Sequence, residues 1–172
     1  GEVTYSPLMS QAWERALAAT SLSADDIDKL IVTGTHGRAV ARNAKRLGVR
    51  DEAMVDDLSG SVGNTGTAHP LLVLTSVLEQ ASPGETIAVM TLADGVEVIV
   101  LRTTDAIAAA APTMSTADQI ASGTTVSYGK FLSWRGMVSV EPPNRPLPNR
   151  PSASAAHRRD DWKFGFVGSR DR

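Results

Sequence analysis

Two runs of β-branched and apolar residues, 86–92 and 96–101, are separated by only three residues, Ala93, Asp94 and Gly95. Asp-Gly between two such runs is a strong signal for a tight β-hairpin, because both residues accept the backbone angles that the turn needs. The two runs are therefore predicted to be neighbouring antiparallel strands. This hairpin constrains the fold more than any other feature, because other elements have to cover its apolar faces.

The residues before the hairpin alternate between helix and strand signals. Ser6 and Pro7 are interpreted as an N-cap and a first helical residue, and apolar residues then recur at helical spacing to about Thr20. The apolar run 30–33 predicts a strand, and a helix after it is expected to end at Gly48. A loop with three glycines, 58–67, leads into a helix over 68–81, which is apolar nearly all round and is expected to be buried on most sides. The order predicts an α/β fold, a layered α-β-α unit with a mixed sheet that ends in the β-hairpin.

Charge and proline divide the chain near Asp105. Residues 1–104 carry 8 Lys and Arg, 13 Asp and Glu and 3 prolines. Residues 105–172 carry 9 Lys and Arg, 6 Asp and Glu and 6 prolines. Five of the prolines fall within 141–151, too many for a helix interior or a central strand. We therefore expect a first domain over 1–140 with its core largely before Asp105, an extended Pro-rich linker over 141–158 and a tail over 159–172.

The composition excludes several classes of protein. The chain has no cysteine, so it supplies no thiolate nucleophile, disulfide or cysteine-bound zinc. No run of about 18 apolar residues is present, so we expect no membrane association and, by default, a cytoplasmic location. The net charge of -2, with no aromatic residues between the basic ones, argues against a nucleic-acid partner. Asp56 and Asp57 have no third ligand at suitable spacing, and no metal site is predicted.

A histidine after the first strand, His36, precedes a Gly-Asn-Thr-Gly loop over 63–66 that enters the apolar helix. Pro83 and Gly84 then lead into the closing strand pair. This arrangement resembles the C-terminal half of the thiolase superfamily, and most closely the archaeal-type hydroxymethylglutaryl-CoA synthase branch. Residues 128–136 resemble the C-terminal segment of that branch, so the resemblance covers roughly 1–140.

The resemblance implies half of an active site for carbon-carbon bond chemistry on coenzyme A thioesters. It identifies His36 and Asn64 as catalytic donors to the thioester or ketone oxygen, on which negative charge develops in the transition state. It places Gly63, Thr65 and Gly66 against the substrate, because a glycine-flanked loop lets the backbone approach a thioester closely. Arg38, on a basic helix face, would meet the coenzyme A phosphates. The thioester is the substrate, and no covalently bound cofactor is expected.

The resemblance also implies partners. The acyl-accepting cysteine of this superfamily lies in its N-terminal half, so we expect a cysteine-bearing partner on another chain or segment. Residues 161–170 resemble the entry to the zinc-ribbon and OB-fold module that accompanies such enzymes, which suggests a second partner. The apolar helix over 68–81 needs more cover than one half offers, so we expect an oligomer rather than a monomer.

Structural explanations compete with these assignments. His36 could be a loop histidine that is hydrogen-bonded for structure, and Asn64 could supply a turn residue with positive φ. His69, before Pro70, is more easily explained as an N-terminal helix residue than as a ligand. Arg38 and its basic neighbours Arg42, Lys45 and Arg46 could form a solvated helix face.

Three classes of function remain open from the sequence. The first is a part or subunit of a CoA-dependent acyltransferase, or of a related retro-aldolase from steroid side-chain breakdown. The second is a non-catalytic scaffold that binds CoA esters. The third is an unrelated α/β module. The acyl chain and the direction of reaction do not follow from these residues.

Overall fold

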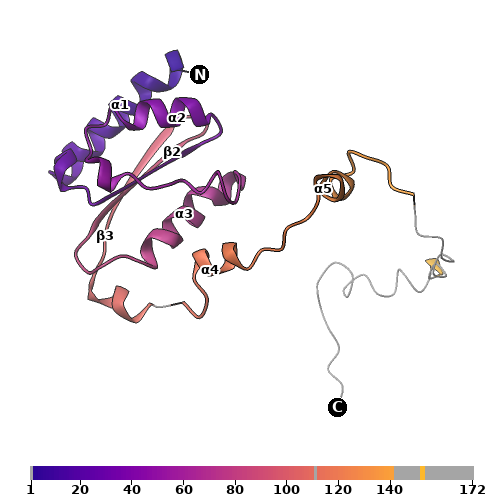
Figure 1. Cartoon of the computed structure of the whole chain (residues 1–172). Helices are drawn as coiled ribbons and strands as arrows, with labels where there is room; N and C mark the ends of the chain where they lie inside the picture. The colour runs from indigo at the N-terminus through magenta and orange to yellow at the C-terminus, as the bar shows by residue number, and fades with distance from the viewer. Residues whose placement is uncertain (1, 111, 142–151, 154–172) are drawn as a thin grey trace. The chain divides into compact units, whose positions relative to one another are not determined.

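The computed structural model describes residues 2–110, 112–141 and 152–153, and the chain separates into two compact units, Gly1–Thr124 and Thr125–Arg172. Unit 1 contains a three-stranded sheet with helices on both of its faces (Figure 1). Apart from Glu141 and residues 152–153, the linker and tail expected over 141–172 lie outside the described residues.

The sheet of unit 1 is mixed, in the order β1-β2-β3. Strand β1 (Lys29–Gly34) runs parallel to β2 (Thr86–Leu92), which pairs antiparallel with β3 (Val96–Arg102) in the predicted hairpin. In the turn, the Ala93 N–H donates to the Gly95 carbonyl over 3.0 Å. The predicted hairpin and the mixed sheet are both confirmed.

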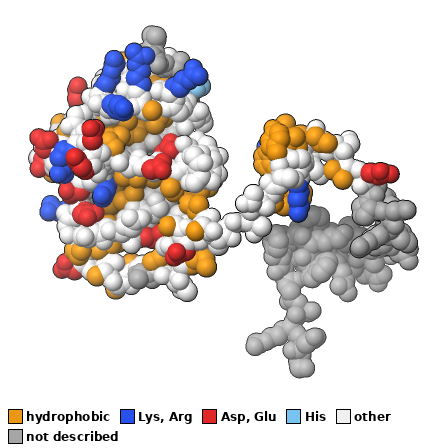
Figure 2. All heavy atoms as spheres, viewed as in Figure 1, with side chains coloured by type: hydrophobic (Ala, Val, Ile, Leu, Met, Phe, Trp, Pro, Cys, Tyr) orange, Lys and Arg blue, Asp and Glu red, His pale blue; other side chains and the backbone are white. Residues whose placement is uncertain are grey.

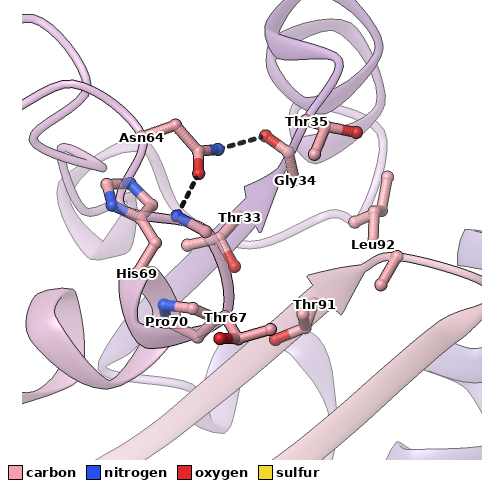
Figure 3. Close-up of a pocket in the computed structure, with 11 residues that line it drawn as sticks. Thr33, Gly34, Thr35, Asn64, Thr67, His69, Pro70, Thr91 and Leu92 are labelled. Atoms are coloured by element: carbon pink, nitrogen blue, oxygen red, sulfur yellow. Dashed lines mark hydrogen bonds between the residues drawn. The ribbon is translucent and has the colours of Figure 1, made fainter.

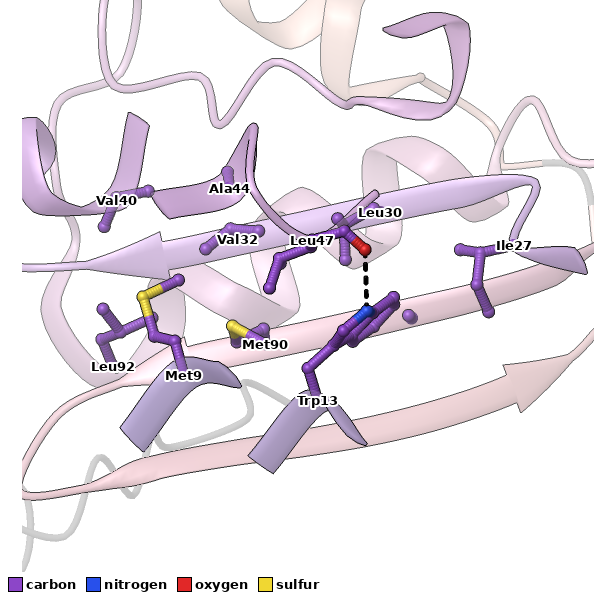
Figure 4. Packing of buried hydrophobic residues seen from close by; sticks show 11 residues of the cluster. Met9, Trp13, Ile27, Leu30, Val32, Val40, Ala44, Leu47, Met90 and Leu92 are labelled. Atoms are coloured by element: carbon purple, nitrogen blue, oxygen red, sulfur yellow. Dashed lines mark hydrogen bonds between the residues drawn. The ribbon is translucent and has the colours of Figure 1, made fainter. Parts of the chain in front are cut away.

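Two separate clusters of apolar side chains form the core. On one face of the sheet, α1 (Glu2–Thr20) and α2 (Gly37–Ala44) cover the alternating side chains of β1 and β2 (Figure 4). Trp13 of α1 is central there, and its Nε1 donates to the Leu47 carbonyl over 2.9 Å. On the other face, Val73 and Val77 of α3 (His69–Leu78) pack against Ile31 and neighbouring strand residues. The layered α-β-α prediction is therefore confirmed.

Helix α1 begins earlier than predicted, at Glu2, and Pro7 lies inside it. The predicted N-cap at Ser6 is therefore wrong. A proline loses one hydrogen bond to the carbonyl four residues earlier, here that of Val3 in the first turn. Burial of Met9 and Trp13 on the sheet offsets that loss. Ser6 instead donates its hydroxyl to Asn43 Oδ1 of α2 over 2.7 Å.

Helices α2 and α3 are shorter than predicted. Helix α2 ends at Ala44, and a turn then leads to Gly48, which adopts a φ of 75°. Helix α3 is buried on its sheet-facing side, whereas Leu71 on another side is 66% exposed. A helix on a sheet buries only the face that it presents to the strands, so the cover expected from a partner on the other sides of α3 stays a prediction.

Local caps fix the remaining short elements. Ser23 donates its hydroxyl and its backbone N–H to the Asp26 carboxylate before β1, and these hydrogen bonds lower the pKa of Asp26. Ser115 caps helix α4 (Thr116–Ala121), and Glu79, which follows α3, accepts hydrogen bonds from the Thr116 backbone and hydroxyl. These contacts hold α4 against the end of α3.

Unit 2 contains α5 (Tyr128–Trp134), in the segment that resembles the synthase C-terminus. Ser127 caps the helix, because its hydroxyl accepts from the Lys130 N–H. The Tyr128 and Phe131 rings stack at 6.1 Å, and Lys130 Nζ lies 5.0 Å from the centre of the Trp134 ring. In the part of the chain that is described, no helix is long and apolar enough to cross a membrane.

Candidate active site

The carboxyl ends of β1 and β2 meet at one edge of the sheet, where Gly34 lies opposite Leu92. In open α/β sheets this is the edge at which ligands bind. Close packing requires a glycine at position 34, because a Cβ there would lie 2.9 Å from Leu92 Cβ and 3.1 Å from Val40 Cγ2. The segments that follow β1 and β2 therefore begin where the ends of the two strands are closely packed.

Asn64 is held at this edge by two hydrogen bonds (Figure 3). Its Nδ2 donates to the Gly34 carbonyl over 3.2 Å, and its Oδ1 accepts from the Gly66 N–H over 2.8 Å. Gly63 and Gly66 have φ angles of 77° and 70°, which favour glycine. Asn64 is not among the positive-φ residues of the described chain, so the turn-residue explanation for it is wrong. One N–H of its amide remains for a ligand.

His36 lies at the same edge, two residues after Gly34, at the N-cap position of α2. Its side chain is exposed and makes no capping hydrogen bond. The ring lies beside Tyr5 of α1, with 6.0 Å between ring centroids and a tilt of 52°. Tyr5 in turn donates its hydroxyl to the Ala93 carbonyl over 2.9 Å. His36 is thus linked through Tyr5 to the end of β2.

A cavity of about 310 Å³ opens at this edge. Its lining residues are Thr33, Gly34 and Thr35 beside β1, Thr91, Leu92 and Ala93 beside β2, and Asn64, Gly66, Thr67, His69 and Pro70 at the start of α3. No Asp, Glu, Lys or Arg is among the described residues that line it. The cavity thus combines hydroxyl and amide groups with apolar surface, which suits an uncharged group.

The predicted site residues divide into two sets. Asn64 and Gly66 line the cavity, whereas His36, Arg38, Gly63 and Thr65 do not. Arg38 is exposed on α2, and several Lys and Arg side chains gather at the end of unit 1 that carries α2 (Figure 2). The structure therefore brings His36 and Asn64 to one edge but gives only Asn64 a place on the cavity wall.

Two buried polar groups line this cavity, and neither was assigned a role in the site from the sequence. His69, which begins α3 as expected of an N-terminal helix residue, is 2% exposed, and its Nε2 has no hydrogen-bond partner in the described structure. Thr33 Oγ1 on β1 is likewise buried and without a partner there. A His-Pro pair at a helix start was the only sequence signal for His69.

The described residues include no group of three or more His, Cys, Asp or Glu that could hold a metal ion. What the edge offers is a fixed hydrogen-bond donor, the Asn64 amide, which two hydrogen bonds hold in place. Such donors stabilise an oxyanion because they need no reorganisation when the charge develops.

Comparisons with known proteins agree with this architecture. A family model described as 3-oxoacyl-[acyl-carrier-protein] synthase III C terminal matches residues 17–102. The hydroxymethylglutaryl-CoA synthase of Aeropyrum pernix is 31% identical over 144 residues, which are 81% of this chain and 40% of that protein. The crystal structure of 3-oxoacyl-(acyl carrier protein) synthase III from Pseudomonas aeruginosa superposes with a TM-score of 0.52 at 24% identity, over 60% of this chain and 33% of that one. The chain thus spans well under half the length of these proteins.

Proposed function

Since the chain belongs to the 3-oxoacyl-[acyl-carrier-protein] synthase III C-terminal family, a C-terminal half of the thiolase superfamily, we propose that it forms part of a CoA-dependent acyltransferase. In this proposal it supplies His36 and Asn64 as donors to an active site whose cysteine lies on another chain or segment. Membership of the family makes an unrelated α/β module untenable.

The observation that carries the proposal is the position of Asn64. Its amide is fixed between Gly34 and Gly66 on the wall of the cavity, and it keeps one N–H for a ligand. A preorganised donor of this kind stabilises an oxyanion by about 3 to 4 kcal/mol. We therefore assign Asn64 to the oxygen of the thioester or ketone, and His36 at the same edge to the same oxygen.

The rest of the edge supports the binding of a thioester. The cavity would take the acyl group, and the backbone of Gly63, Thr65 and Gly66 would lie along the thioester. Arg38 and Arg42 on α2, with Lys45 and Arg46 just after it, would meet the phosphates of coenzyme A, whose charge is opposite. The fit of an uncharged acyl group follows from the absence of charged side chains among the described lining residues.

The proposed enzyme needs a partner that bears a cysteine. This chain has none, and acyl transfer in this superfamily passes through an acyl-cysteine. We propose that the partner also covers the exposed side of α3, where Leu71 is 66% exposed. A zinc-ribbon and OB-fold module is proposed as a second partner on the resemblance of residues 161–170 alone.

The proposal is tested by tagging the chain, identifying by mass the polypeptide that co-purifies with it, and measuring the change in free CoA. Acetyl-CoA probes condensation, which releases free CoA, and acetoacetyl-CoA with free CoA probes cleavage, which consumes it. We expect no turnover by the chain alone and turnover by the complex with a cysteine-bearing partner. Turnover by the isolated chain would show that the assignment of the missing cysteine is wrong.

One observation favours a second candidate, a scaffold that binds CoA esters without turnover. His36 does not line the cavity, so the two donors do not converge within the described unit. Binding of acetyl-CoA in every pairing, with neither release of free CoA in condensation nor its consumption in cleavage, would favour the scaffold over the enzyme.

A further inference from the structure

The buried imidazole of His69 lies next to the loop that carries Asn64. His69 is the first residue of α3, and its side chain reaches back towards Thr65. The Thr65 backbone N–H donates to Nδ1 over 3.4 Å, and the Thr65 hydroxyl lies at the same distance from Nδ1. A nitrogen that accepts a hydrogen bond carries no hydrogen, so the neutral ring carries its hydrogen on Nε2.

We propose that His69 is a positioning residue, whose Nδ1 holds Thr65 and thereby keeps Asn64 at the end of β1. Thr65 follows Asn64 directly, so a hydrogen bond to its backbone restrains the peptide that carries the Asn64 side chain. The Asn64 amide makes the remaining side-chain contacts of this loop, to Gly34 and Gly66.

The loop depends on these hydrogen bonds because burial contributes little to it. Residues 64–68 are exposed, and His69 is the nearest buried residue of the segment. Gly63 and Gly66 on either side raise the number of backbone conformations that the free loop could adopt. An acceptor fixed in the core therefore selects one conformation of the loop.

The two ring nitrogens allow the proposal to be tested by a matched pair of variants. Asparagine places its side-chain oxygen near the position of Nδ1, whereas glutamine places its amide near the position of Nε2. His69→Asn therefore keeps the acceptor for Thr65, and His69→Gln removes it. Because Nε2 has no partner in the described structure, its loss should not matter.

Amide hydrogen exchange in the chain alone is the first measurement. We expect the Thr65 and Gly66 amides in His69→Asn to exchange within about threefold of the wild-type rate, and in His69→Gln at least about tenfold faster. The ¹⁵N spectrum of the wild-type imidazole should place the hydrogen on Nε2. A hydrogen on Nδ1, or equal exchange in the two variants, would overturn the proposal, and the spectrum needs no variant to fold.

The second measurement is kcat with acetyl-CoA in the complex with the co-purifying partner, and it rests on the proposed function. Small misplacements of a catalytic group cost up to about 10²-fold, so we expect kcat in His69→Gln to fall about 10- to 10²-fold with KM unchanged. His69→Asn should restore kcat to within about threefold of wild type. Equal kcat in both variants, where Asn64→Ala does lower kcat, contradicts the positioning role even if exchange differs. If instead the Asn64→Ala complex turns over normally while exchange behaves as expected, the proposed function fails and the positioning of the loop stands.

Discussion

Gly34 is the residue at which the candidate site meets the core. Its carbonyl accepts from Asn64, and its α-carbon faces Leu92 and Val40 at distances that leave no space for a methyl group. The same residue thus closes the sheet edge and anchors the loop. A larger side chain at this position should therefore lower the stability of unit 1 and displace Asn64.

We predict that Gly34→Ala lowers the free energy of unfolding by about 1–3 kcal/mol, because the added Cβ overpacks a site bounded by backbone and by a Cβ. Urea unfolding measures the change. Gly37→Ala is the matched control, since a Cβ at Gly37 meets nothing within 4 Å. Equal stability of the two variants would show that the edge is more adaptable than the structure indicates.

At the scale of single residues, the sequence was informative at positions whose backbone angles favour one residue type. Gly63 and Gly66 have the positive φ angles that glycine-rich turns adopt, and the resemblance selected Asn64 between them. The importance of His69 could not be predicted, because its hydrogen bond exists only once α3 and the loop have closed on each other. The roles of His36 and Asn64 stay predictions.

The helices and strands of unit 1 were predicted correctly where the local sequence signal for a turn or helix end agrees with the way the element packs in the core. The hairpin followed from Asp94 and Gly95 between β-branched runs, and its two strands occupy the expected residues. The start of α1 did not follow, because Ser6 and Pro7 are a local signal for a helix start that packing of α1 on the sheet overrides. The exposed side of α3 could not be predicted either. The apolar pattern of a helix shows which of its sides are hydrophobic, but not which neighbouring element covers each side.

The contact between α1 and α2 tests this account of the core. Trp13 is buried, and its Nε1 hydrogen bond to Leu47 joins α1 to the turn after α2. We predict that Trp13→Phe lowers the free energy of unfolding by about 1–3 kcal/mol, because it removes a buried hydrogen bond and part of the ring volume.

The control for Trp13 is Trp134→Phe in α5, where the side chain is 66% exposed. That substitution should change the stability of unit 1 by less than about 0.5 kcal/mol. Thermal unfolding followed by circular dichroism compares the two. A Trp13 variant as stable as the Trp134 variant would contradict the packing of α1 described above.

At the scale of the whole molecule, unit 1 has the fold of a C-terminal half of the thiolase superfamily, and the sequence contains no cysteine. The layered unit and its family membership agree with the sequence prediction. The expected partners stay proposals, in which a cysteine-bearing half contributes the opposite wall of the site. The two donors lie at one sheet edge, but only Asn64 reaches the cavity within the described unit.

The central claim is that Asn64 and His36 stabilise an oxyanion in the assembled enzyme. The most direct measurement is kcat for release of free CoA from acetyl-CoA by the complex with its cysteine-bearing partner, for wild type, Asn64→Ala and His36→Ala. We predict a fall of about 10² to 10³ in kcat for each variant with little change in the stability of the chain, because a preorganised donor acts in the transition state. Full kcat in both variants within the intact complex would contradict the account.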